Sequence, residues 1–151
     1  MPLLVTQRHG IPFSELRLIT MSAPPKFLEL PGLCVTLDRL VYRDVAEESP
    51  DRPHSFAYFL TIHNGSTQTV TIRGRKWVVV HDDGNTTVVE GEGVVGQTPT
   101  LEPGGEFSYN SHHLIDTSTA TVEGSYLGVT PEGDRVLIRI PCFELTVPGK
   151  N

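Results

Sequence analysis

The sequence lacks any long hydrophobic run. Apolar stretches such as Val78 to Val80 are only a few residues long, whereas a membrane-spanning helix needs about 20 apolar residues. The sequence therefore predicts no membrane span. Residues 1–12 also lack the apolar core of a secretory signal, so we expect a cytoplasmic protein.

Basic residues are also few. The 12 Lys and Arg residues are outnumbered by 18 Asp and Glu residues, which gives a net charge of -6. A general nucleic-acid binder needs a basic surface to contact phosphates. The charge balance therefore predicts that this protein has no nucleic-acid partner.

Cysteine is scarce, since the chain has only Cys34 and Cys142. They are far apart in the sequence and have neither the spacing of a zinc knuckle nor that of a redox pair. In a reducing compartment we expect two buried thiols rather than a disulfide. A single domain of 151 residues can bury about 70% of its surface on folding, so it needs no disulfide or structural metal.

Turn-forming residues, by contrast, are abundant. The 14 Gly and 12 Pro residues argue against a helical bundle. From Leu33 onward the hydrophobic pattern has a period of two residues, which indicates strands. Seven short strands without a helical pattern predict an all-β domain, an immunoglobulin or fibronectin type III-like two-sheet β-sandwich. The expected strands are Leu33–Arg43, Phe56–His63, Gln68–His81, Thr86–Glu90, Glu106–Ser111, Ala120–Val129 and Arg135–Val147.

The first 31 residues differ from the rest. Pro24, Pro25 and Pro31 interrupt regular structure there, and Phe13–Ile19 could form one or two helical turns. We therefore expect an irregular N-terminal extension over residues 1–31 and a single domain over residues 32–148.

Alternation within the strands predicts which side chains form the core. Phe56, Tyr58, Leu60 and Ile62 share one face of their strand, and Trp77 is also expected inside. In the last strand the parity of the apolar residues changes after Pro141, which predicts a bulge there. A similar slip is expected near Arg39 and Leu40. Four turns are each expected to join neighbouring antiparallel strands: His63–Ser66, Asp82–Asn85, Glu102–Gly105 and Pro131–Asp134.

Gly91, Gly93 and Gly96 match a G-x-G-x-x-G pattern. A dinucleotide-binding unit would require a helix after these glycines, but Pro99 and a further turn follow instead, so we exclude that function. If Asp83 and Gly84 form a two-residue hairpin turn, the numbers of any two residues that face each other across the hairpin add up to 167.

That register places Trp77 opposite Glu90 and brings the glycines beside Arg75 and Lys76. Two interpretations remain open. Backbone N–H groups of Gly91, Gly93 and Gly96 could bind an anion together with Arg75 and Lys76. Alternatively, Glu90 and Glu92 neutralise these cations, and the glycines only permit a bulge beneath Trp77.

The other groups of reactive side chains do not have the spacing of a metal site or of a catalytic site. His112 and His113 are adjacent in a strand and should point to opposite faces, and Asp82 and Asp83 next to His81 are common turn residues. We therefore predict no metal site and no cofactor. The nearest nucleophile grouping is Ser111, His112 and Asp116, without a nucleophile elbow, so we predict that the protein is not an enzyme.

An ordered series of motifs resembles the ApaG family, which is also called CorD. The series covers about Gly32 to Pro148 and differs from the family pattern at His112, Ser118, Ala120 and Val122. It consists of Arg75-Lys76-Trp77, Asp83-Gly84, Gly91–Gly96, Pro99, Leu101, Pro103-Gly104, Phe107, Tyr109, Ser111, Leu114, Thr117, Thr121, Glu123–Tyr126 and Ile140–Val147.

This resemblance implies a fibronectin type III-like sandwich in a bacterial, cytoplasmic protein with a link to cobalt resistance and magnesium efflux. It also implies a domain type that mediates protein–protein interaction. We therefore expect a non-enzymatic binding module with an as yet unidentified protein partner. The alternative is a sensor of pyrophosphate, a nucleotide or a divalent metal that uses the Gly91–Gly96 loop with Arg75 and Lys76.

Overall fold

All regular structure in the described chain is β-strand. The structure is a computed structural model that describes residues 4–6 and 26–149, so the possible helical turns at Phe13–Ile19 lie outside it. The strands are β1 (Leu4–Thr6), β2 (Leu33–Asp44), β3 (His54–Asn64), β4 (Val70–His81), β5 (Thr86–Glu92), β6 (Thr100–Leu101), β7 (Glu106–Ile115), β8 (Thr119–Val129) and β9 (Arg135–Thr146). No helix in these residues is long and apolar enough to cross a membrane.

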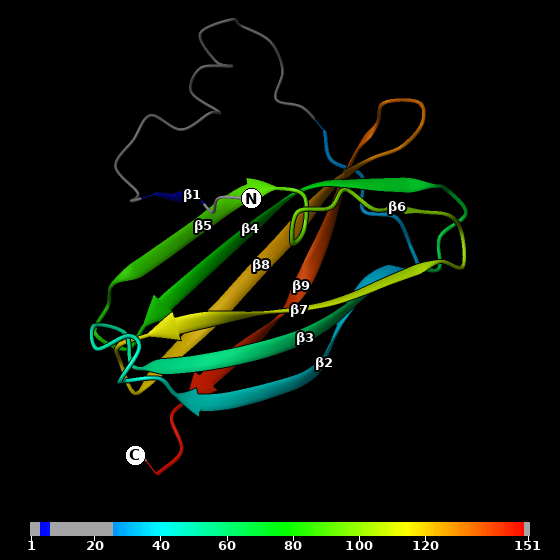
Figure 1. Cartoon of the computed structure of the whole chain (residues 1–151). Helices are drawn as coiled ribbons and strands as arrows, with labels where there is room; N and C mark the ends of the chain where they lie inside the picture. The colour runs from blue at the N-terminus through cyan, green and yellow to red at the C-terminus, as the bar shows by residue number, and fades with distance from the viewer. Residues whose placement is uncertain (1–3, 7–25, 150–151) are drawn as a thin grey trace, which may run out of the picture.

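The strands form two antiparallel sheets that lie face to face (Figure 1). The larger sheet has the order β1-β5-β4-β8-β9, and the short β6 also pairs with β4. The smaller sheet has the order β2-β3-β7. This arrangement confirms the predicted all-β, two-sheet sandwich.

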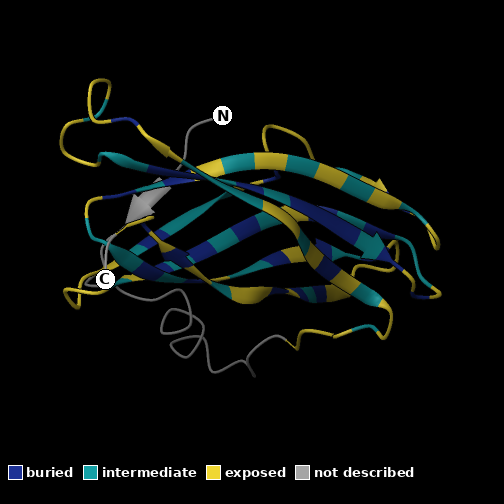
Figure 2. Cartoon of the chain, turned by 90° about the horizontal axis from the view of Figure 1, so that it is seen from below, coloured by how far each residue is buried: buried dark blue, intermediate teal, exposed yellow. Residues whose placement is uncertain are grey.

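The core lies between the sheets, where the predicted faces meet. Phe56, Tyr58, Leu60 and Ile62 of β3 are all buried, and so is Trp77 of β4. Figure 2 shows the alternation of buried and exposed residues along the strands. Both predicted register changes are confirmed: one lies between Leu37 and Arg39 of β2, and one lies in β9, across from Val122 and Gly124, at Pro141 and Cys142.

Two of the four predicted turns join different sheets. His63–Ser66 leads from β3 to β4, and Glu102–Gly105 leads from β6 to β7, so the expectation that they join paired strands was wrong. The buried Asn64 side chain holds these two crossings together, because its amide donates to the carbonyl oxygens of Gln68 and Leu101 at 2.8 and 2.9 Å. Turn residues indicate that a chain reverses, but not which sheet the next strand joins.

The prediction of two buried thiols was also wrong, since Cys34 and Cys142 are free and exposed. Cys34 precedes the buried Val35 in β2, so alternation turns its side chain outward. Cys142 lies at the β9 bulge, beside the change of parity.

Segments of the N-terminal extension pair with both edges of the larger sheet. The strand β1 pairs with β5 over Leu4–Thr6. Near the start of the domain, Leu28 forms a parallel bridge with Val136 of β9, and the Glu29 carboxylate binds the Arg139 guanidinium at 2.9 Å. The extension predicted over residues 1–31 is thus joined to the sandwich at these two places.

Candidate functional site

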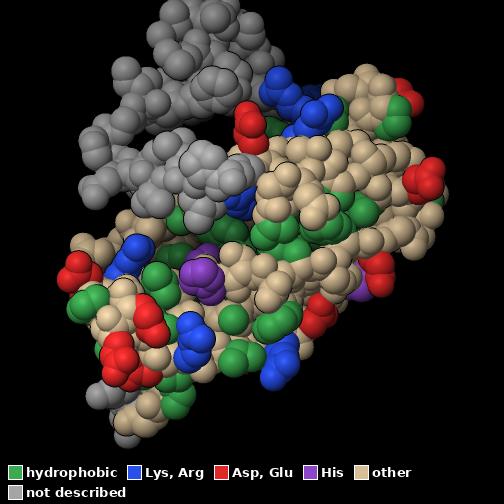
Figure 3. Space-filling view, viewed as in Figure 1, with side chains coloured by type: hydrophobic (Ala, Val, Ile, Leu, Met, Phe, Trp, Pro, Cys, Tyr) green, Lys and Arg blue, Asp and Glu red, His purple; other side chains and the backbone are tan. Residues whose placement is uncertain are grey.

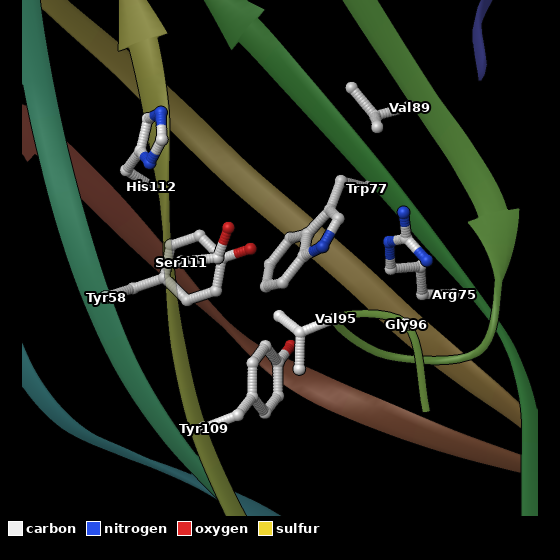
Figure 4. A pocket seen from close by; sticks show the side chains of 9 residues that line it. All are labelled: Tyr58, Arg75, Trp77, Val89, Val95, Gly96, Tyr109, Ser111 and His112. Carbon is white, nitrogen blue, oxygen red and sulfur yellow. The ribbon is translucent and has the colours of Figure 1, made fainter. Parts of the chain in front are cut away.

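A cavity of about 250 Å³ opens between the two sheets on the side where β5 and β7 lie (Figure 4). Of the described residues that line it, only Arg75 has a side chain that is always charged. Aromatic rings and hydroxyl groups form much of the remaining wall. The lining residues are Tyr58, Arg75, Trp77, Val89, Val95, Gly96, Tyr109, Ser111 and His112.

An aromatic cluster underlies the cavity. The rings of Tyr58 and Trp77 lie 5.0 Å apart between centroids, and His113 lies 4.8 and 4.9 Å from them. The Tyr109 hydroxyl is hydrogen-bonded to that of Tyr126, and burial raises the pKa of both phenols above the usual value. Burial in the cluster therefore keeps these phenols neutral.

Two buried nitrogen atoms in this cluster lack a hydrogen-bond partner among the described residues: Nε1 of Trp77 and Nε2 of His113. Burial lowers the pKa of His113 to about 4, and the nearby His112 contributes to this shift. Leaving a buried polar group unpaired costs about 1–3 kcal/mol. Of these two residues, Trp77 lines the cavity, so its unpaired N–H is the one that bears on what the cavity could bind.

Arg75 is buried, although its side chain is charged. Its Nη1 donates to the carbonyl oxygens of Glu92 and Gly93 at 2.8 and 2.9 Å. The guanidinium passes over Gly91, where a Cβ atom would lie 2.7 Å from Nη2. A side chain at position 91 would therefore displace the Arg75 guanidinium from its present place.

The β4–β5 register differs by one residue from the predicted one. Opposed residues pair as Arg75 with Gly91 and Lys76 with Glu90, because the hairpin has a three-residue turn that ends on Gly84 at a φ of 89°. The predicted two-residue turn was therefore wrong. The Asp-Gly pair does not distinguish the two turns, because a glycine with positive φ occurs both in two-residue hairpin turns and at the end of three-residue hairpin loops.

Alternation along β4 separates the two cations of the predicted anion site, because Arg75 and Lys76 are consecutive residues of one strand. Arg75 faces the cavity, whereas the Lys76 ammonium lies on the other face of the sheet, 3.8 Å from the Glu90 carboxylate. An anion beside Arg75 would not contact Lys76. The prediction from sequence placed both residues near the glycines but did not take into account that they lie on opposite faces of β4.

The Gly91–Gly96 segment ends β5 and makes a tight turn, and no helix follows it. Its backbone N–H groups largely bind the chain itself. Gly93 donates to the Arg73 carbonyl oxygen at 2.7 Å, and Val94 and Gln97 donate to each other's carbonyl oxygens at 2.7 and 2.9 Å. A Cβ atom at Gly93 would lie 2.3 Å from the Gln97 carbonyl oxygen, so that position requires glycine.

The predicted metal candidates are not brought together. The described residues contain no group of three or more His, Cys, Asp or Glu side chains that could hold a metal ion. His112 is exposed and His113 is buried, which confirms that they face opposite sides of β7. Ser111 and His112 line the cavity, whereas Asp116 is exposed beyond the end of β7.

Val95 is under backbone strain at the mouth of the cavity. Its φ is 43°, and no other non-glycine residue described has a positive φ. This left-handed conformation costs a β-branched residue about 1–2 kcal/mol, whereas asparagine tolerates it. We expect Val95→Asn to raise the free energy of unfolding by about 1 kcal/mol in urea denaturation. Val80→Asn is the control, because Val80 is similarly exposed but lies within β4; an equal effect in both variants would contradict the strain.

Comparison with known proteins shows the family. The model of the ApaG domain matches residues 45–130. Protein ApaG of Pectobacterium atrosepticum is 36% identical over 122 residues, which cover 81% of this chain and 97% of that protein. Protein ApaG of Xanthobacter autotrophicus is 44% identical over 108 residues, covering 70% of this chain and 83% of that protein.

Solved structures show the same fold. A crystal structure assigned to an ApaA protein of Bordetella pertussis superposes with a TM-score of 0.66 at 29% identity, covering 80% of this chain and 99% of that one. The X-ray structure of another structural-genomics target gives a TM-score of 0.71 at 30% identity, covering 80% of this chain and 90% of that one. From the family match and these identities, the chain belongs to the ApaG family.

Proposed function

We propose that this chain is a non-catalytic binding module of the bacterial cytoplasm that recognises a protein partner by adding a strand of that partner to β7. The observation that carries the proposal is the unpaired edge of β7. Among the described strands, β7 pairs only with β3, along all ten of its residues. A long strand edge of this kind offers backbone groups to an extended peptide.

Among the described strands, β2 also pairs only with β3, so the smaller sheet has two open edges; the surface beside β7 favours the β7 edge. A second cavity of about 420 Å³ lies next to the first, and both are lined by Val89 and His112. In Figure 3, hydrophobic side chains and a histidine lie in the hollow between the two layers. In strand addition, backbone hydrogen bonds supply affinity, and pockets for alternate side chains supply specificity. The edges of β5 and β9 are instead covered by β1 and Leu28.

The ladder identifies which N–H groups of β7 remain available. Asn64 N–H donates to the Gly105 carbonyl oxygen at 2.9 Å, at the start of the β3–β7 ladder. Hydrogen-bonded pairs alternate along an antiparallel ladder, so the N–H of Ser111 points toward β3. The N–H of Asn110 therefore points to the open edge.

Proline at position 110 tests the proposal. Peptides selected from a random dodecapeptide phage library on the whole protein are expected to bind Asn110→Pro at least about 10-fold more weakly, because the variant lacks an edge donor. Its melting temperature should change little. Asn110→Ala is the control and should bind like the original chain. Selection of no peptide, or equal binding by Asn110→Pro, would refute strand addition at β7.

The second candidate function is binding of a small free anion such as pyrophosphate by Arg75 and the Gly91, Gly93 and Gly96 segment. Burial of the Arg75 guanidinium beside Gly96 in the same cavity favours it. At 100 times its dissociation constant, such a ligand would add about 2.7 kcal/mol and raise the melting temperature by about 5–10 °C. A thermal-shift titration with pyrophosphate measures this; an unchanged melting temperature would contradict the anion function. The link to cobalt resistance and magnesium efflux stays a prediction from the family.

A further inference from the structure

The Trp77 indole N–H is a buried donor that has no acceptor among the described residues, and the Trp77 side chain lines the cavity. Only 2% of the residue is exposed, and Nε1 has no partner among the described residues. Figure 4 shows the indole ring between Tyr58 and Arg75. Indole nitrogen can donate but cannot accept a hydrogen bond. A ligand that satisfies this atom must therefore bring an acceptor.

Arg75 supplies positive charge at the same place. Arg75 and Trp77 are two residues apart on β4, so both side chains point to the inner face of the sheet. Among the described residues, those that line the cavity include no Asp or Glu. A group with negative charge and acceptor oxygens would therefore complement both the guanidinium and the indole.

The size and polarity of the cavity favour a carboxylate over a phosphate. A volume of about 250 Å³ is below that of a typical small-molecule pocket and suits one side chain. The N–H groups of Gly93, Val94 and Gln97 already bind backbone oxygens, so they add no donors for a phosphate.

We propose that the cavity binds a carboxylate of the partner, held by the indole N–H of Trp77 and the charge of Arg75. The inference rests on the proposed function, because a strand added to β7 would present a side chain beside Tyr109 and Ser111. The aromatic wall formed by Tyr58 and Tyr109 contacts the methylene groups that carry the carboxylate. The carboxylate is an Asp or Glu side chain, or the free end of the partner chain.

The first test is the composition of the selected peptides. The dodecapeptides that bind the whole protein are expected to share an acidic residue at one position. A matched peptide with Gln in place of Glu, or Asn in place of Asp, should bind at least about 10-fold more weakly, since hydrogen bonds to a charged group contribute more than neutral ones. Amidating the peptide terminus distinguishes a side-chain carboxylate from a terminal one.

The second test uses Trp77 directly. It is the only tryptophan, so the chain labelled with nitrogen-15 gives a single indole N–H signal that needs no assignment. The acidic peptide should shift this signal, and the amide-matched peptide should not. Trp77→Phe keeps an aromatic ring but removes the donor, so it should bind the acidic peptide more weakly and narrow the difference in affinity between the two peptides; the remaining difference reports the charge of Arg75.

The outcomes separate this inference from the proposed function. Equal binding of acidic and amide-matched peptides, with loss of both in Asn110→Pro, would overturn the carboxylate site and leave strand addition intact. An indole signal that responds to inorganic pyrophosphate but to no peptide would overturn both and favour the free anion. An indole signal that stays unchanged when an acidic peptide binds would overturn the role of Trp77.

Discussion

Replacing Trp77 with alanine is expected to lower the free energy of unfolding by about 3–5 kcal/mol. The indole is 2% exposed and contacts Tyr58, His113 and Phe143, with ring centroids 5.0, 4.9 and 6.3 Å away. Its removal would leave a void between the sheets that these rings cannot fill without moving. Urea denaturation followed by far-ultraviolet circular dichroism measures the change, because the variant has no tryptophan fluorescence.

Val80→Ala is the matched control for this experiment. Val80 lies on the same strand three residues further on, and it is 41% exposed. Replacing it with alanine should lower the free energy of unfolding by less than about 0.5 kcal/mol. If Trp77→Ala unfolded at the same urea concentration as Val80→Ala, Trp77 would not be part of the stabilising core.

Acidification is expected to destabilise the protein between pH 6.5 and pH 4 through His113. Burial lowers the pKa of this imidazole to about 4, whereas an unfolded histidine titrates near 6.5. Between these values the unfolded chain binds the proton and the folded chain does not, so stability falls as the pH falls. The slope is about 1.4 kcal/mol per pH unit, which amounts to a loss of about 3 kcal/mol over the whole interval.

His113→Phe isolates this contribution, because phenylalanine keeps a ring between Tyr58 and Trp77 but does not titrate. Stability is measured by urea denaturation at pH 7, 6 and 5. The carboxylates of Glu29 and Asp38 also have lowered pKa values, but they lose their contribution only at more acid pH. The slope between pH 6.5 and 5 should be smaller in the variant. An unchanged slope would show that His113 is not the acid-sensitive group.

Most of the fold could be predicted from hydrophobic alternation. The period of two located the buried face of β3, and the parity change after Pro141 located the β9 bulge, since one inserted residue re-aims every later side chain. The pattern could not show that Asn64 directs the chain from one sheet to the other. That choice depends on contacts between residues far apart in sequence, such as Asn64 and Leu101.

The candidate site was predicted less completely. The sequence pattern placed Arg75 near the glycines, but a register error of one residue hid the alignment of Arg75 with Gly91. The unpartnered Nε1 of Trp77 was not predictable, because a missing acceptor depends on every neighbouring side chain. The only signal available from sequence was the spacing of Arg75 and Trp77, which places both on one face of a strand.

The pairing of β1 with β5 and of Leu28 with β9 has a consequence for self-association. Bare strand edges are where β-proteins aggregate, and here both ends of the larger sheet are covered by residues that precede the 45–130 family match. A chain shortened to begin at Leu33 would keep the core but lose both covers. Protection against edge-to-edge aggregation is therefore encoded outside the domain that it protects.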